Sequence, residues 1–295
     1  MYSDFNKGIV HSFLGSFWWG FLGVIYFKYI AFIGYTEIVI HRCLWTALTL
    51  IITTSLFSKW NIFLNIISKW KNVVGLFFSA ILVFLNWTVW IYAVATEKII
   101  DASFGYYIMP ILSVLLGYLF FKEHLNQKRI FCIILVTVSI LFLLLVSTKS
   151  LPWVGIMVAV TWTLYNLIRK KINVDTDVGL LVESLFILPF ALIAFYFLVK
   201  SGENDFKLSD VSLLLLILLA GPMTVIPLFL YVKGVELSGL GPSGMIFFVT
   251  PTLQFLLGFY YYNEQFSSIK LLSFVIIWIA VAIYLRDIYE TNNKK

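Results

Sequence analysis

The sequence has few charged residues. Only 12% of its 295 residues are Asp, Glu, Lys or Arg, whereas a soluble globular domain carries about 25%. Hydrophobic residues make up 61% of the chain, and its mean hydropathy is +0.95. A soluble core of this length could not hide so much apolar surface, so the composition excludes an ordinary soluble domain and predicts a polytopic membrane protein.

Cysteine and histidine, the usual metal ligands, are also scarce. The two cysteines, Cys43 and Cys132, lie in separate apolar runs, and their spacing indicates neither a disulfide framework nor a metal site. The apolar segments contain no acidic pair or His/Cys cluster for hydrolysis, and the sequence has no phosphate-binding loop for ATP. We therefore predict no metal, no cofactor and no enzymatic activity. The net charge of +6 comes without a nucleic-acid-binding motif and is better explained by membrane topology.

What the chain does have is a series of segments that are long and apolar enough to cross a bilayer, which takes about 20 residues each. We count ten of them, at residues 9–29, 36–57, 72–95, 102–121, 129–147, 152–169, 179–199, 211–232, 241–261 and 269–286. The first has no cleavage pattern for a signal peptide and is read as a retained helix. The predicted fold is an all-α membrane protein of ten transmembrane helices, with antiparallel neighbours joined by short loops.

The basic residues predict the orientation. About 14 of the 21 Lys and Arg residues flank the two termini or alternate loops, including the "RKK" run at 169–171. The positive-inside rule then places both termini in the cytoplasm. Residues 58–71 carry tryptophan, phenylalanine and isoleucine at helical spacing between lysines, which favours a helix along the cytoplasmic interface. An ordinary loop is the alternative.

Two stretches of the sequence match when shifted by 141 positions. They are "PILSVLLGYLFFKE" at 110–123 and "PTLQFLLGFYYYNE" at 251–264, which share six of 14 residues, among them a proline, a glycine and a glutamate. This predicts a duplication, with one repeat at 1–147 and the second at 148–295. Each repeat has five spans, so the second enters the membrane inverted. Inverted repeats are typical of transporters, because the two halves can exchange conformations and open to alternate sides.

Several motifs resemble those of a known family. "HR..W" at 41–45, "NW" at 86–87, "FGYYIMP" at 104–110, "RKK" at 169–171 and "E....LP" at 183–189 are similar to the RarD branch of the EamA group, in the drug/metabolite transporter superfamily. The resemblance covers essentially the whole chain. It implies ten helices in a 5+5 inverted arrangement around a central cavity, a bacterial inner-membrane location and transport of small metabolites. Many EamA members have Gly before the glutamate that ends the fourth and ninth helices; here Lys122 and Asn263 stand there.

Three ionisable residues lie clearly inside the predicted spans: His41, Arg42 and Glu183. Such groups are costly in a bilayer and usually face a cavity or a partner. Their predicted depths differ by more than about 10 Å, which argues against an Arg42–Glu183 ion pair. His41 lies four residues after Glu37 on one helix face and could be held by that carboxylate. A structural role stays open, with Arg42 extending to the headgroups and Glu183 hydrogen-bonded in the protein.

Prolines and aromatic residues mark a candidate transport path. Pro110 and Pro251 are expected in mid-helix, and with Pro222 and Pro227 they are candidate hinges or static kinks. Aromatic and amide side chains around them are candidates to line a central cavity: Trp18, Trp19, Asn86, Trp87, Trp90, Tyr106, Tyr107, Trp162, Tyr165, Asn166, Phe247, Phe248 and Gln254. An individual aromatic residue more often faces lipid or packs in the core, and the amides are the better candidates because they need partners within hydrocarbon. Glu123 and Glu264 end two helices and are read as gate latches or as markers of the water boundary.

The function predicted from these features is secondary-active or facilitative transport, by alternating access, of small organic metabolites such as amino acids or related amphipathic and aromatic compounds. The expected partners are a small-molecule substrate and the lipid bilayer, and a monomer and a homodimer both stay open. One alternative is a flippase for a lipid-linked substrate. An intramembrane enzyme is the weakest reading, because the spans contain no catalytic cluster.

Overall fold

The computed structural model describes residues 4–95, 99–147, 153–206, 210–260 and 268–292, and every regular element in these ranges is a helix. The elements are α1 (Asp4–Trp18), η1 (Trp19–Gly23, a π-helix), α2 (Val24–Tyr29), α3 (Tyr35–Leu56), α4 (Trp60–Ile67), α5 (Trp70–Ala95), α6 (Ile99–Phe121), α7 (Gln127–Ser147), α8 (Trp153–Ile172), α9 (Thr176–Ser201), α10 (Val211–Leu218), α11 (Ala220–Ser238), α12 (Leu240–Ile246), α13 (Val249–Tyr260) and α14 (Ser268–Asn292).

Within the described residues, seven stretches of helix are long and apolar enough to cross a membrane. They come from α1–α2, α3, α5, α9, α10–α11, α12–α13 and α14, and α6 adds a shorter apolar stretch. Many large apolar side chains on these helices are exposed, such as Phe190 and Leu56, at 70% and 75%. Such a surface is unstable in water and suited to lipid. The chain is therefore a multi-pass membrane protein.

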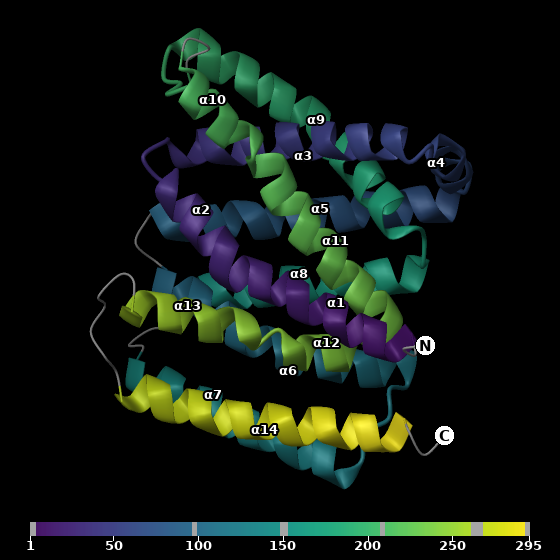
Figure 1. Ribbon diagram of the computed structural model, residues 1–295, viewed down its shortest axis with the longest axis vertical. Coiled ribbons are helices and arrows are strands. Elements are labelled where there is room, and N and C mark those ends of the chain that lie inside the picture. Colours follow the sequence, from purple (N-terminus) through teal and green to yellow (C-terminus); the bar gives the residue numbers. More distant parts are fainter. Residues whose placement is uncertain (1–3, 96–98, 148–152, 207–209, 261–267, 293–295) are drawn as a thin grey trace.

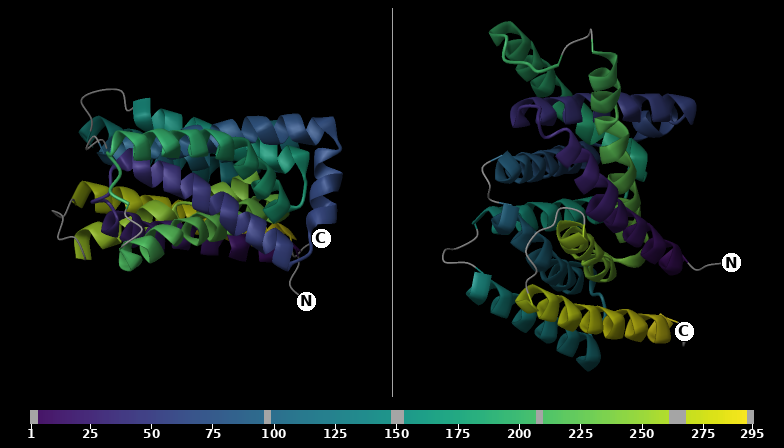
Figure 2. Two further views of the ribbon diagram at one scale, coloured as in Figure 1. Left: turned by 90° about the horizontal axis from the view of Figure 1, so that it is seen from above. Right: turned by 60° about the vertical axis from the view of Figure 1, so that its left-hand side comes forward.

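The long helices lie side by side in a stack, and each runs roughly from one side of the stack to the other (Figures 1 and 2). The first and last described residues lie on the same side of this stack (Figure 1). We call this side the terminal end and the opposite side the distal end. The short helix α4 runs across the terminal end, roughly perpendicular to the long helices (Figure 2, left). The helix expected within 58–71 is therefore present, with Trp60 39% and Trp70 76% exposed.

Three of the predicted spans are not regular α-helices. The first passes through the π-helix η1, the segment 211–232 divides at Leu219 into α10 and α11, and the segment 241–261 divides after Ile246 into α12 and α13. Hinged or broken helices were expected around the prolines at 221–227 and at 251, and both segments are interrupted close to these prolines. Pro251 lies in the first turn of α13, not in mid-helix as expected. A first-turn proline loses no helical hydrogen bond, so the helix can begin again just before it.

Contacts between the two halves of the chain hold the stack together. The main pairs are α1 with α11, α6 with α8, α5 with α8, α3 with α9, α7 with α14 and α6 with α12. At the α1–α11 contact, a Cβ on Gly15 would lie 2.9 Å from the carbonyl oxygen of Pro227 and 2.9 Å from the amide nitrogen of Tyr231. Only glycine allows this close an approach of two helix backbones, which is a common device in membrane helix packing.

Candidate functional site

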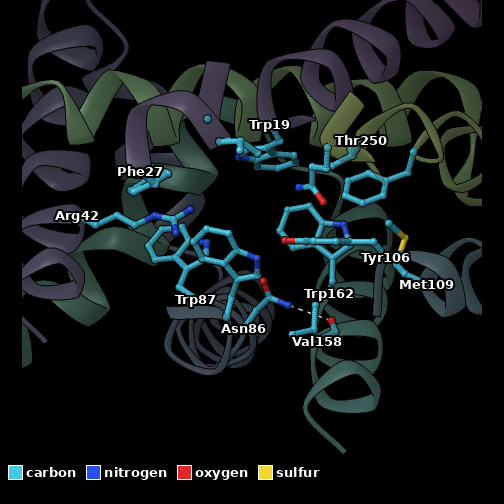
Figure 3. Close-up of a pocket in the computed structure, with 15 residues that line it drawn as sticks. Trp19, Phe27, Arg42, Asn86, Trp87, Tyr106, Met109, Val158, Trp162 and Thr250 are labelled. Atoms are coloured by element: carbon cyan, nitrogen blue, oxygen red, sulfur yellow. Dashed lines mark hydrogen bonds between the residues drawn. The ribbon is translucent and has the colours of Figure 1, made fainter. Parts of the chain in front are cut away.

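A cavity lies where the two halves of the chain meet, with a volume of about 60 Å³ (Figure 3). The first half contributes residues from α1–α2, α3, α5 and α6, and the second from α8 and the α12–α13 break. The lining residues are Trp19, Gly23, Val24, Phe27, Arg42, Asn86, Trp87, Trp90, Tyr106, Met109, Val158, Trp162, Phe247, Thr250 and Gln254. Most of them lie in the middle or the distal parts of their segments, so the cavity is displaced away from the terminal end.

The structure brings together some of the residues proposed from the sequence, including eight of the 13 aromatic and amide residues proposed to line a cavity. Those that line the cavity are Trp19, Asn86, Trp87, Trp90, Tyr106, Trp162, Phe247 and Gln254, together with Arg42. The others are not among the lining residues: Trp18, Tyr107, Tyr165, Asn166, Phe248, His41, Glu183, Pro110, Pro222, Pro227 and Pro251. Tyr107 and Phe248 pack in a separate apolar cluster with residues of α7 and α14. Their helices turn them away from the cavity that their neighbours Tyr106 and Phe247 face.

Arg42 reaches the cavity from α3 (Figure 3). Its guanidinium carbon lies 4.4 Å from the ring centre of Trp87 and 5.0 Å from that of Phe27, distances at which a cation is attracted to an aromatic face. Its Nε donates a hydrogen bond of 3.0 Å to the hydroxyl of Thr224 in α11. The residue is only 5% exposed, so the alternative in which Arg42 extends to the lipid headgroups is wrong.

An aromatic layer closes the cavity toward the terminal end. The ring centres of Trp19 and Trp162 are 5.0 Å apart, those of Trp162 and Tyr231 are 5.7 Å apart, and those of Tyr231 and Phe247 are 5.2 Å apart. Asn86 joins α5 to α8, because its amide nitrogen donates hydrogen bonds to the Val158 carbonyl at 2.9 Å and to the Thr161 hydroxyl at 3.1 Å. The cavity walls are thus largely apolar and carry a few oriented polar groups, as small-molecule sites do.

A buried ionic network lies beyond this layer, nearer the terminal end. Glu183 accepts hydrogen bonds from the hydroxyls of Ser79 and Tyr165, and its Oε1 is 3.6 Å from Nη1 of Arg169. Arg169 also donates a hydrogen bond to the backbone of α9 and faces Glu236 of α11 at 3.9 Å. The network joins α5, α8, α9 and α11. In it Glu183 faces Arg169, which agrees with the prediction that Glu183 and Arg42 do not form an ion pair.

Arg169 and Glu236 were missed by the sequence analysis. We assigned Arg169 to a basic loop, but α8 continues to Ile172 and leaves Arg169 only 1% exposed. The ionisable residues within the bundle therefore include more than the three predicted. A signal was present, because Trp162, Asn166 and Arg169 follow one another at intervals of four and three residues, which places them on one helix face. Gly179 of α9 has no side chain and thereby leaves room for the guanidinium.

At the distal end, Glu37 and His41 connect α3 to the loop between α9 and α10. The Glu37 carboxylate accepts backbone hydrogen bonds from Asp205 at 2.6 Å and Phe206 at 2.9 Å. The expected contact with His41 is present at 3.4 Å, and the imidazole lies against the ring of Phe206, with 5.1 Å between centres. His41 therefore belongs to this distal junction, one residue from Arg42 but turned away from the cavity.

Glu123 makes a second junction, at the terminal end. Its two carboxylate oxygens accept hydrogen bonds from the backbone of Leu240 at 2.7 Å and Gly241 at 2.8 Å. Lys170 of α8 lies 3.5 Å away. The preceding residue, Lys122, has φ of +53°, a left-handed conformation that glycine adopts more readily. This explains why glycine suits the position that Lys122 occupies. Glu264, the proposed counterpart of Glu123, and the neighbouring Asn263 lie outside the described residues.

Comparisons with known proteins agree on the family. The model of the EamA-like transporter family matches twice, at residues 6–145 and 150–286. Protein RarD of Salmonella typhi is 32% identical over 290 residues, covering 98% of both chains. A Vibrio cholerae protein described as an uncharacterized transporter is 34% identical over 284 residues, covering 96% of this chain and 93% of its own. A crystal structure superimposes with a TM-score of 0.71 at 14% identity, covering 95% of this chain and 97% of its own; it shares the fold. The chain belongs to the EamA-like transporter family, and its relatives include RarD proteins.

Proposed function

We propose that the protein is a secondary-active or facilitative transporter that carries small organic metabolites across the bacterial inner membrane by alternating access. The single observation that carries the proposal is the cavity built jointly by the two halves of the chain. Its aromatic walls and few amide, hydroxyl and guanidinium groups suit an amphipathic or aromatic solute, such as an amino acid or a related compound.

The contacts between helices support two inverted repeats, 1–147 and 148–295. If the spans are numbered in order, such repeats pair the first with the sixth, the second with the seventh, and so on. The contacts α3–α9, α6–α12 and α7–α14 then join equivalent spans, and α1–α11 has its equivalent in α5–α8. The two matches of the family model, at 6–145 and 150–286, divide the chain in the same place. Ten spans with both termini on one side follow from this arrangement.

The distribution of polar contacts supports alternating access. Between the cavity and the terminal end lie the aromatic layer, the Arg169 network and the Glu123 junction, whereas among the described residues the distal end is joined chiefly through Glu37. Most of the Lys and Arg residues flank the terminal end, which assigns that end to the cytoplasm by the positive-inside rule. On this assignment, the conformation in the structure is closed toward the cytoplasm.

Counterflow in proteoliposomes tests the proposal. Purified protein is reconstituted, the vesicles are preloaded with a mixture of unlabelled amino acids and related organic acids, and labelled solutes are added outside. We expect transient accumulation of at least one labelled solute above the level in protein-free vesicles. No accumulation across the panel, with protein shown to be folded, would refute transport of small metabolites. Activity on a lipid-linked sugar instead would assign the protein as a flippase.

A further inference from the structure

Arg42 differs from the other buried arginines described in the structure. Arg129 and Arg169 lie 2.8 Å from Asp287 and 3.6 Å from Glu183. In the part of the chain that the structure describes, no Asp or Glu side chain lies within 4 Å of the Arg42 guanidinium.

A buried cation without a counter-ion is expensive. Placing an arginine within a membrane span costs about 2.5–3.5 kcal/mol on insertion scales, and the stacking on Trp87 and Phe27 with one hydrogen bond to Thr224 compensates only in part. The guanidinium carries five N–H donors in a planar fork, and only the one on Nε has a protein partner among the described residues. The guanidinium of Arg42 points into the cavity (Figure 3), so its remaining N–H donors are available to a solute bound there.

The cavity contains the rest of a matched site. A guanidinium fork binds a carboxylate through two parallel hydrogen bonds, the strongest and most specific arrangement available to it. Beyond Arg42, the lining offers Trp19, Trp90 and Trp162 for an apolar group and the amides of Asn86 and Gln254 for neutral polar groups. No Asp or Glu lines the cavity among the described residues, so a cationic solute would meet Arg42 without a balancing negative charge.

Resting on the proposed function, we infer that the substrates are organic anions, each with a carboxylate held by the guanidinium of Arg42 and an aromatic or branched apolar body held by the tryptophans. The anion supplies the counter-charge that Arg42 lacks. The stacking of the guanidinium between Trp87 and Phe27 keeps the fork in place for it, so little ordering is needed when the solute binds.

The test is competition in the counterflow assay with three compounds of nearly one shape: phenylacetate, its neutral amide phenylacetamide, and the cation phenethylamine. Labelled phenylpyruvate serves as the carried solute. We expect phenylacetate to compete at least about tenfold better than phenylacetamide, because a hydrogen-bonded contact to a charged group is worth about 1.5–3 kcal/mol, and tenfold corresponds to about 1.4 kcal/mol. Phenethylamine should compete least.

Variants of Arg42 test whether this residue causes the preference for phenylacetate over phenylacetamide. In Arg42→Gln the advantage of phenylacetate over phenylacetamide should fall to about twofold or less, and Arg42→Lys should restore part of it, since it keeps the charge but loses the planar fork. Lys200→Gln removes one positive charge from an exposed site at the end of α9 and should leave the preference unchanged. If the Arg42 variants do not fold, thermal unfolding of the wild-type protein tests the preference for the acid instead. Phenylacetate should raise the unfolding midpoint, and phenylacetamide should leave it unchanged.

The outcomes separate the two claims. Counterflow in which acid and amide compete equally, or an Arg42→Gln variant that keeps the full acid preference, would overturn the anion site while leaving the transporter intact. Counterflow of none of the compounds tested, by folded protein, would overturn the proposed function and this inference with it.

Discussion

Glu123 provides the sharpest test of how the terminal end is held closed. Its carboxylate at the end of α6 accepts hydrogen bonds from the backbone of Leu240 and Gly241 at 2.7 and 2.8 Å. It thereby ties the first half of the chain to the α11–α12 junction of the second. In Glu123→Gln one acceptor oxygen remains, and an amide NH₂ faces the other backbone N–H, so one hydrogen bond is lost and the other loses its charge.

The magnitude follows from these two contacts. Hydrogen bonds to a charged group are worth about 1.5–3 kcal/mol each, and a single neutral bond about 0.5–1.5 kcal/mol. The Glu123 side chain is 20% exposed, so water compensates part of the loss, and we take about 2–3 kcal/mol as the change. If the contacts exist only in the closed conformation, the open population should rise about 30- to 150-fold, at about 1.4 kcal/mol for each factor of ten.

The assay uses Ser243→Cys, a small change at a fully buried position on α12. The rate of its modification by a membrane-impermeant thiol reagent, applied from the terminal side, reports the open population. We expect Glu123→Gln to raise this rate by at least tenfold, up to saturation. The control is Glu290→Gln, which removes a carboxylate from an exposed pair with Arg286 at the same end. An unchanged rate in folded Glu123→Gln protein would show that the contact is not a gate.

Three further predictions concern stability, measured by thermal unfolding in detergent. Glu183→Gln should destabilise the protein by up to about 3–5 kcal/mol, because it removes the nearer of the two carboxylates that face the buried Arg169 and leaves only Glu236. The Arg169→Gln/Glu183→Gln double variant should lose less than the sum of the single losses, and additive losses would refute the coupling. Partial burial lowers the pKa of Lys59, but the hydrogen bonds and the attraction of Asp177 and Asp175 together outweigh this and raise the pKa overall. The stability that these contacts contribute is therefore fully present below the ordinary pKa near 10.4 and is lost as the pH rises through the raised value. Lys59→Gln should remove the part of the stability loss that sets in above the ordinary lysine pKa, and should leave the pH dependence near neutrality unchanged. Lys122→Gly should stabilise the protein by about 0.5–1 kcal/mol, because it relieves the left-handed strain; a lower unfolding midpoint would refute this.

Most of the helix positions could be predicted from the sequence. Expected and observed bounds differ by only a few residues for spans such as 36–57 and 72–95, because the bilayer sets the length of each apolar run. Hinged or broken helices were expected around Pro222, Pro227 and Pro251, but the exact break points, at Leu219 and after Ile246, were not predicted. A Gly-Pro pair is compatible both with a kinked continuous helix and with a restart in the first turn, and only the packing of neighbouring helices selects between them.

The site was harder to predict than the fold, because its contacts join residues far apart in the chain. Residue type alone singled out Arg42 and Glu183, since charges are rare in membrane helices. Their partners Thr224 and Arg169 have no local sequence relation to them. The neighbours Tyr106 and Tyr107 appear equivalent in the sequence, yet one lines the cavity and the other packs against Phe274. Helix rotation, set by tertiary packing, decides between them.

The central claim is that the cavity opens to alternate sides of the membrane. The most direct test is Thr250→Cys, at the cavity wall, in a background where Cys43 and Cys132, both buried, are replaced by alanine. A membrane-impermeant thiol reagent is applied to vesicles of either orientation. We predict modification from both sides and protection from both by a transported solute. Modification from one side only, with solute present or absent, would contradict alternating access.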